Sequence, residues 1–301
     1  MNPLLTDIFC VIDDFCKSFD KKYQHFFLTS VKKSIKKPRS VACKLSLSEI
    51  MTIVILFHTS GYRTFKDFYL LSVCKDLKEY FPQSLSYSRF VQVMEYALMP
   101  LAVFLNGVKG KETHIYYADS TCIEVCHIKR AKSHKVFKGL AEKGKSSMGW
   151  FFGFKLHLVI NNLGEIMACS LTPANTDDRK PVPKLVESLN GWLFADKGYI
   201  GKAFSEKLKE QSIEIFTKVK KNMKKRILNV TQQFYLSKRG LIETVNDQLK
   251  NICYIEHTRH RKPANAFVNL LSGLIAYSFK PRKPSIKNNK LPPNILQLTS
   301  N

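Results

Sequence analysis

The spacing of apolar residues changes near residue 113, and the order of segments beyond it restricts the fold more than any other feature. Before it, apolar residues recur at helical spacing. After it, short apolar runs typical of strands alternate with stretches typical of helices. The predicted order is strand, strand, strand, helix, strand, helix, strand, helix, at residues 115–118 (continued by 123–127), 151–160, 165–172, 177–189, 193–195, 203–211, 213–219 and 238–251. A core helix at 264–279 follows. This order predicts an α/β fold, with helices on the faces of a mixed sheet.

Two stretches within this region carry their own predictions. Asn161-Asn162-Leu163-Gly164 is typical of a turn that joins two strands into a hairpin. Residues 129–149 are polar, basic and without apolar periodicity, which predicts a mobile loop.

The first 110 residues are predicted to be helical. Ser46 and Glu49 have the spacing of a capping box ahead of a helix at 50–58, and further helices are predicted at 65–80 and 88–105. Short helices joined by tight turns suit either a DNA-reading unit of the helix-turn-helix kind or a helical packing unit, and the pattern leaves both open. We therefore expect a helical domain at 1–110, an α/β domain at 113–280 and a disordered basic tail at 281–301.

The charge of the chain points to a polyanionic partner. Lys and Arg number 48 against 24 Asp and Glu, a formal net charge of +24. Basic runs spread along the chain and interleaved with Tyr and Phe favour nucleic acid over a merely basic, solvated surface. No segment is typical of a signal peptide, membrane span or lipid anchor, so we expect a cytoplasmic, nucleoid-associated protein without a membrane partner.

Cysteine spacing argues against a zinc site. The eight cysteines form no CxxC pair, and Cys122, Cys126 and His127 have no partner pair that would complete four ligands. Free thiols in a reducing compartment are the better interpretation.

Three short segments each offer one acidic residue in a setting that suits a metal site. Asp119 and Asp196 are each placed at the end of a predicted strand, and Glu243 lies on a predicted helix. Acids at the ends of neighbouring strands can converge at one edge of a sheet, and a helix can supply the third. Three such carboxylates can hold two divalent cations about 3.5–4 Å apart against a phosphodiester. Magnesium prefers hard oxygen ligands of this kind, and manganese can replace it.

Each acid also has an ordinary structural interpretation. Asp119 and Asp196 could be turn residues, and Glu243 could belong to a solvated ion pair on its helix. Four other acids compete for the site, and Asp247 is the strongest of them because it lies one turn beyond Glu243. The four are Glu124, Asp177, Asp178 and Asp247.

The motifs around the three acids resemble those of DDE transposases of bacterial insertion sequences, and within these the insertion-sequence 982 group. The resemblance covers roughly residues 1–280 and is carried by Tyr117-Ala118-Asp119-Ser120-Thr121, Phe194-Ala195-Asp196-Lys197-Gly198-Tyr199 and Lys238-Arg239-Gly240-Leu241-Ile242-Glu243-Thr244-Val245. Related families carry a tyrosine–arginine–glutamate–lysine signature on the last helix. Arg239 and Lys250 fit its spacing, whereas Leu236 stands where Tyr is expected and Tyr235 lies one residue earlier.

The resemblance implies a ribonuclease-H-like catalytic domain, which suits the interpretation of the helical residues 1–110 as a DNA-binding domain. It implies that Asp119, Asp196 and Glu243 are the catalytic metal ligands, for two Mg²⁺ ions. The implied activity is binding of the element's ends, metal-dependent cleavage and joining of the 3′-hydroxyl ends to target DNA, by a homodimer assembled on double-stranded DNA. The alternatives are a metal-dependent nuclease without strand transfer and an inactive, element-derived DNA-binding protein.

Basic and aromatic residues near the acids are predicted to contact DNA. For Arg239 and Lys250 the alternative is a ladder of ion pairs along their helix. The full set is Arg239, Lys250, Lys197, Tyr199, Lys129, Arg130, Lys221, Lys224, Lys225 and Arg259.

Overall fold

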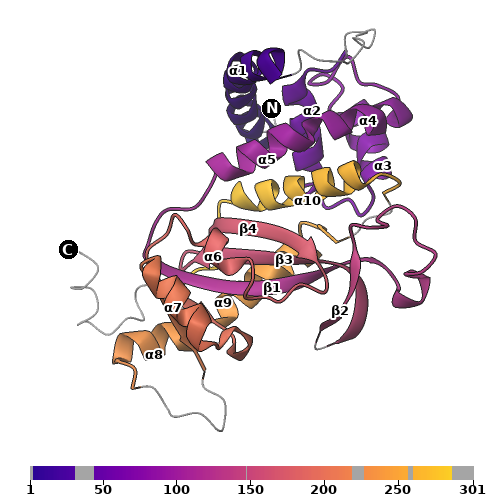
Figure 1. Cartoon of the computed structure of the whole chain (residues 1–301). Coiled ribbons are helices and arrows are strands. Elements are labelled where there is room, and N and C mark those ends of the chain that lie inside the picture. The colour runs from indigo at the N-terminus through magenta and orange to yellow at the C-terminus, as the bar shows by residue number, and fades with distance from the viewer. Residues whose placement is uncertain (1–2, 31–43, 147, 219–226, 257–259, 287–301) are drawn as a thin grey trace. The chain divides into compact units, whose positions relative to one another are not determined.

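The computed structural model describes residues 3–30, 44–146, 148–218, 227–256 and 260–286 (Figure 1). The chain divides into two compact units. One contains Met1–Val108 together with Leu249–Phe279, and the other contains Lys109–Gln248 together with Lys280–Asn301.

The first unit is helical, as the sequence predicts. Its α-helices are α1 (Pro3–Ser30), α2 (Leu47–Phe57), α3 (Phe65–Asp67), α4 (Tyr87–Val93), α5 (Leu98–Gly107) and α10 (Pro263–Ser278). A π-helix, Phe68–Asp76, follows α3, and a 3-10 turn, Met94–Ala97, joins α4 to α5. By length and composition alone, the run Tyr87–Gly107 could cross a membrane, and its residues Phe90 and Leu101 are fully buried in this unit.

The capping box predicted ahead of α2 is confirmed. The Glu49 backbone N–H donates to Ser46 Oγ at 3.1 Å, and the Ser46 N–H donates to Glu49 Oε2 at 2.6 Å. Two N–H groups that the helix cannot satisfy internally are thereby paired. The helix that follows is almost wholly buried.

Helix α10 belongs to the helical unit, although the sequence pattern groups residues 249–279 with the α/β domain. It packs on α2 and α5, and Val268, Leu274 and Ile275 are at most 1% exposed. Apolar periodicity identifies a buried helix but not its partners, which is why the sequence does not indicate this long-range packing.

The second unit is built on one mixed sheet. Its strands are β1 (Ile115–Cys126), β2 (Glu142–Ser146), β3 (Gly149–Asn161), β4 (Ile166–Pro173), β5 (Gly191–Ala195) and β6 (Ile213–Thr217). The order is β2-β3-β1-β5-β6, and β4 also pairs with β3. The pairs β1–β3, β2–β3 and β3–β4 are antiparallel, whereas β1–β5 and β5–β6 are parallel. Antiparallel strands extended by two parallel strands, β5 and β6, form a mixed sheet, as the order of segments predicts.

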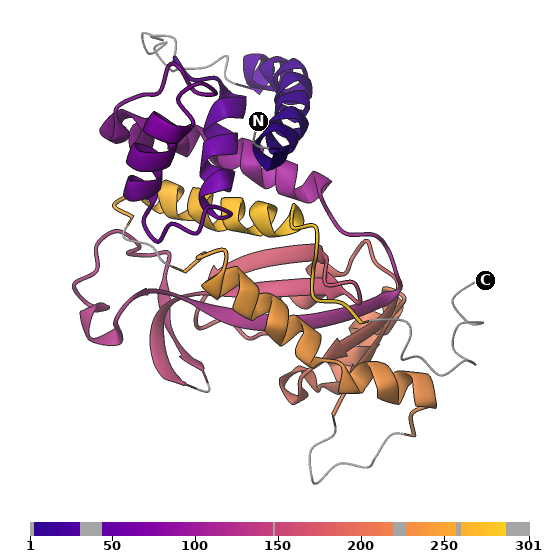
Figure 2. The same ribbon diagram turned by 180° about the vertical axis from the view of Figure 1, so that it is seen from behind.

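Helices cover both faces of this sheet. Figure 1 shows α6 (Val182–Leu185) and α7 (Lys202–Glu210) on one face, and Figure 2, from behind, shows α8 (Val230–Ser237) and α9 (Gly240–Asn251) on the other. Side chains alternate between the faces of a strand. Accordingly Tyr116 and Ala118 join the core beneath α6 and α7, whereas the Tyr117 hydroxyl donates to the Tyr235 carbonyl of α8 at 3.1 Å.

Two predictions for this unit were incomplete. The mobile loop at 129–149 contains a 3-10 turn, Ile128–Arg130, and the strand β2, so that prediction is wrong for residues 142–146. β2 has no apolar periodicity, and its backbone pairing with β3 does not require one. Gly144 is needed at its position in this strand because a Cβ there would collide with the Ala174 carbonyl. Helix α8 was not predicted, although Asn229 and Gln232 form a capping box at its start.

Candidate active site

Asp119 lies within a long strand rather than at a strand end. β1 continues seven residues beyond it to Cys126, and Asp119 is paired with Leu158 of β3. It shares a face of the sheet with Tyr117, so its side chain is on the side of α8 and α9. The strand predicted at 115–118 and its continuation at 123–127 are thus one strand, and Asp119 is held within it rather than at its end.

Asp196 directly follows β5, as predicted, and the pairing of strands brings it level with Asp119. Tyr117 of β1 is aligned with Phe194 of the parallel strand β5. Each aspartate comes two residues after one member of this pair. Neighbouring strands lie about 4.8 Å apart, so the two acids are neighbours on the same side of the sheet.

Glu243 lies in the first turns of α9, where Arg239 connects it to the second aspartate. The Arg239 guanidinium is 2.5 Å from Glu243 Oε1 and 4.0 Å from Asp196 Oδ1. Arg239 is mostly buried, whereas the two carboxylates are about half exposed. The guanidinium group of Arg239 thus lies between two of the three predicted acids.

Asn246 connects the same helix to the remaining aspartate. Its Nδ2 donates to Asp119 Oδ2 at 3.3 Å, and its own Oδ1 is buried without a hydrogen-bond partner among the described residues. The sequence analysis did not single out this residue. Its position three residues after Glu243 places it on the same side of the helix and is the signal that could have identified it.

The electrostatics of Asp119 are those of a carboxylate short of positive charge. The pKa of its carboxyl is raised to about 6, mainly by burial and to a smaller extent by the nearby Glu243 and Asp178. The Ser120 backbone N–H and Arg239 act in the opposite direction. Ionised Asp119 is therefore disfavoured by desolvation and by like charge, and a cation beside it would offset both effects.

The chemistry of these groups fits a divalent cation, although their present arrangement is closed. Carboxylate oxygens and the unpartnered amide oxygen of Asn246 are the hard ligands that magnesium prefers. Within the described part of the chain, however, no three His, Cys, Asp or Glu residues are grouped closely enough to hold a metal ion. Since Arg239 occupies Glu243 Oε1, a cation held by all three acids would compete with its guanidinium for that carboxylate.

The competing acids have other partners. Asp178 accepts from Ser120 Oγ at 2.8 Å and from Lys155 Nζ at 2.9 Å. Asp177 pairs with Arg179 at 2.6 Å, and hydrogen bonds from Arg179 lower its pKa to about 2. Asp247 is exposed on α9. Asp178 lies near enough to influence the Asp119 carboxyl but serves the network around Lys155.

Residues predicted to contact DNA are in different situations. Lys197, Lys129 and Arg130 are exposed and available. Tyr199 is only 3% exposed and belongs to the core under α7, where packing accounts for its ring, and its contact with DNA stays a prediction. Lys250 pairs with Glu256 at 3.2 Å. The predictions for Lys221, Lys224, Lys225 and Arg259 lie outside the described residues.

Arg239 makes the ion pair along the helix that was the alternative to phosphate contact, whereas Lys250 pairs with Glu256, which lies beyond the end of α9. Tyr235, one residue out of the signature's register, is buried, and its ring packs against Phe194 at 6.0 Å between centroids. Packing accounts for its position. Cys122 and Cys126 are half-buried and form no disulfide with another described cysteine.

Comparisons with known proteins bear on this arrangement of acids. No curated protein matches the chain. Among solved structures, it is similar to a chain of the cryo-EM structure of a simian T-cell lymphotropic virus intasome in complex with the PP2A regulatory subunit B56 gamma. That similarity has 13% identity and a TM-score of 0.25, over 62% of this chain and 64% of that chain. Residues 109–263, more than half of the 301, match the family described as "Transposase DDE domain", and the match includes Asp119, Asp196 and Glu243. The chain therefore belongs to the family of transposase DDE domains.

Proposed function

We propose that this protein is a DNA transposase of a bacterial insertion sequence, close to the insertion-sequence 982 group. In this proposal it binds the ends of its element, cleaves them at the 3′ side and joins the freed 3′-hydroxyl groups to target DNA. It acts as a homodimer on DNA, in the cytoplasm with the nucleoid. The observation that carries the proposal is the convergence of Asp119, Asp196 and Glu243 from two adjacent strands and one helix, in a chain of net charge +24.

Asp119, Asp196 and Glu243 would hold the divalent cations, Mg²⁺ or Mn²⁺. When bound, these cations activate the attacking oxygen and stabilise the leaving oxygen of the phosphodiester. The strands fix Asp119 and Asp196, while the amide of Asn246 orients the Asp119 carboxylate. Because the Asp119 carboxylate is already oriented, less free energy is spent on ordering it when the substrate binds.

Arg239 has two roles in this proposal. Without substrate it neutralises Asp196 and Glu243, which would otherwise repel each other and the incoming phosphate. Once the carboxylates take other partners, its guanidinium is free to bind a phosphate with two parallel hydrogen bonds. The exposed Lys197, directly after Asp196, adds a second positive charge at the same edge of the sheet.

One observation favours the inactive alternative enough to keep it in the test. The described residues contain no preformed group of metal ligands, and an inactive, DNA-binding descendant of a transposase would have no need of one. A nuclease without strand transfer would use the same three acids and differs only in its products.

The test uses the protein with DNA taken from the borders of its own reading frame, where terminal inverted repeats are expected. Incubation with Mg²⁺ should yield cleaved ends and products joined to a target plasmid. Cleavage without joining supports the nuclease, and binding without cleavage supports the inactive protein. Asp119→Asn, Asp196→Asn and Glu243→Gln should each abolish cleavage and leave binding largely intact.

Asp247→Asn is the matched control, since it removes one exposed carboxylate from the same helix as Glu243. It should cleave like the wild type. If Asp247→Asn is inactive while Glu243→Gln remains active, the assignment of the third acid is wrong.

A further inference from the structure

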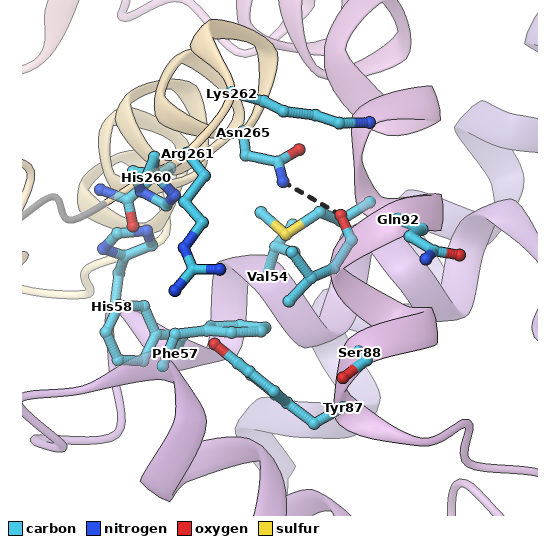
Figure 3. A pocket seen from close by; sticks show the side chains of 14 residues that line it. Val54, Phe57, His58, Tyr87, Ser88, Gln92, His260, Arg261, Lys262 and Asn265 are labelled. Atoms are coloured by element: carbon cyan, nitrogen blue, oxygen red, sulfur yellow. Dashed lines mark hydrogen bonds between the residues drawn. The ribbon is translucent and has the colours of Figure 1, made fainter. Parts of the chain in front are cut away.

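The helical unit contains a cavity of about 490 Å³ that the proposed function does not use. Residues of α2, α4 and α10, with the residues just before α10, line it, as Figure 3 shows. Its volume lies within the range of roughly 300–1,000 Å³ that is typical of small-molecule sites.

Aromatic rings form one wall of this cavity. Phe57, Phe65 and Tyr87 all line it, and their rings contact one another. The ring centroids of Phe57 and Phe65 are 5.4 Å apart, and those of Phe65 and Tyr87 are 6.4 Å apart. Because these rings are fixed by one another, they present a firm apolar surface on which a planar ring can stack.

A positive charge stands at this wall. Figure 3 shows the Arg261 side chain pointing into the cavity, towards Phe57 and Tyr87. Arg261 is exposed, and it makes no ion pair with a carboxylate in the described parts of the chain. The neighbouring Lys262, by contrast, pairs with Glu95 at 2.9 Å. Arg261 is thus available for an anion bound at the mouth of the cavity.

The polar groups deeper in the cavity are neutral. Burial lowers the pKa of both His58 and His260 to about 4, so neither carries a charge at neutral pH. Asn265 Nδ2 donates to the Val91 carbonyl at 3.0 Å, which fixes the amide, and Asn265 Oδ1 is buried without a partner among the described residues. The site therefore combines an aromatic wall, uncharged hydrogen-bonding groups and the guanidinium of Arg261.

We infer that this cavity binds a single nucleotide, with the base against the aromatic wall and the phosphate at Arg261. The four features of the site match the parts of a nucleotide: a flat ring, edge groups that hydrogen-bond, a limited volume and one anionic phosphate. Proteins that bind unpaired bases use such aromatic surfaces to stack them. The nucleotide is an unpaired one within a DNA strand. This assignment to DNA rests on the proposed function.

The test measures binding of full-length protein to two duplexes of the same sequence at one salt concentration. One is fully paired, and the other carries a single unpaired 2-aminopurine, whose fluorescence falls when it stacks. We expect about tenfold tighter binding of the duplex with the unpaired base, with quenching, in keeping with the stacking contribution. Equal affinity for both duplexes would overturn the inference.

Two variants locate the effect. Ser88→Trp places a large side chain into the cavity from an exposed position of α4, and Arg261→Gln removes the guanidinium. Both should lose the tenfold preference and keep the affinity for the paired duplex. Arg89→Gln is the matched control, because Arg89 is an exposed cation next to Ser88 that does not line the cavity. It should retain the preference, and a preference that survives in Ser88→Trp would contradict the proposed site.

Two further arms separate the sources of the nucleotide. Competition by free deoxyadenosine monophosphate at concentrations far below those of the DNA phosphates would assign the cavity to free nucleotides and overturn its assignment to DNA. Asp119→Asn should keep the full preference for the unpaired base. Loss of cleavage and loss of nucleotide binding can therefore be observed independently.

Discussion

Asn246 of α9 is uncharged, yet its side chain contacts one of the three proposed metal ligands. Its amide contacts Asp119 at 3.3 Å, while Arg239 and Glu243, on the same side of the helix, form an ion pair. A side chain that only orients a carboxylate should affect how well that carboxylate performs its role rather than whether DNA binds. Residues in this position typically change metal affinity or activity by about 10–100-fold when they are removed.

We therefore predict that Asn246→Ala slows Mg²⁺-dependent cleavage by about 10–100-fold and raises the Mg²⁺ concentration needed for half-maximal rate. DNA affinity should stay within about twofold of the wild type, since the substitution removes no positive charge that could bind a phosphate. The measurement is the cleavage rate at saturating DNA across a Mg²⁺ titration. Asn251→Ala makes the same change at an exposed position of α9 and should leave both quantities unchanged. An unchanged Mg²⁺ dependence in Asn246→Ala would leave Asn246 with a packing role only.

The three acids could be predicted from local sequence because each follows a recognisable apolar run or helix. Their register could not, because the alignment of Tyr117 with Phe194 arises from strand pairing over 77 residues of separation. Arg239 was predicted to touch phosphate, and only the structure places it between Asp196 and Glu243. Tyr199 follows a site residue closely in sequence, yet its side chain turns into the core.

At the scale of elements, α10 depends on one glycine for its packing within the helical unit. A Cβ at Gly273 would collide with the side chain of Ile255 and would lie 3.3 Å from His58 Nδ1. His58 is itself bound through Nδ1 to the Cys253 carbonyl at 2.5 Å, so the surrounding groups have little room to move. The close approach of α10 to this segment requires the absence of a side chain.

Gly273→Ala should therefore destabilise the protein by about 1–3 kcal/mol through overpacking. Helix propensity alone would make the variant more stable than the wild type by about 1 kcal/mol. The two effects have opposite signs, so the sign of the change in the free energy of unfolding shows which of them is larger. The midpoint of urea denaturation measures it. Gly107→Ala, at the end of α5 with no atom near the new Cβ, should be neutral or slightly stabilising. If Gly273→Ala is about 1 kcal/mol more stable than the wild type, as helix propensity alone predicts, the close packing of α10 is wrong.

The elements that the sequence predicts well are those with strong local signals. The β3–β4 hairpin follows from two apolar runs and a turn rich in Asn and Gly, and α2 from its capping box. β2 gives no such signal, because the backbone pairing with β3 that forms it does not depend on an apolar pattern. α8 is short, and residues 219–226, shortly before it, are rich in Lys and Arg, so the start of a new helical pattern is hard to recognise.

At the scale of the whole molecule, the net charge of +24 makes a prediction that depends on no single contact. Binding of DNA by Lys and Arg releases condensed counterions, so affinity falls with salt at a slope of about −0.9 for each phosphate neutralised. A protein with six to ten such contacts loses roughly 10³–10⁵ in affinity between 50 and 200 mM salt. We expect this protein to fall in that range when its dissociation constant for element-end DNA is measured across the same concentrations.

The exposed pair Lys129 and Arg130, in the turn that follows β1, should account for part of this slope. Lys129→Gln combined with Arg130→Gln should reduce the slope by about two, one for each phosphate that is no longer neutralised. The control is Lys207→Gln combined with Lys209→Gln, which removes the same charge from the exposed end of α7. If both double variants reduce the slope equally, the effect follows net charge alone. A reduction confined to the first pair places the DNA backbone along the turn after β1, on the strand that carries Asp119.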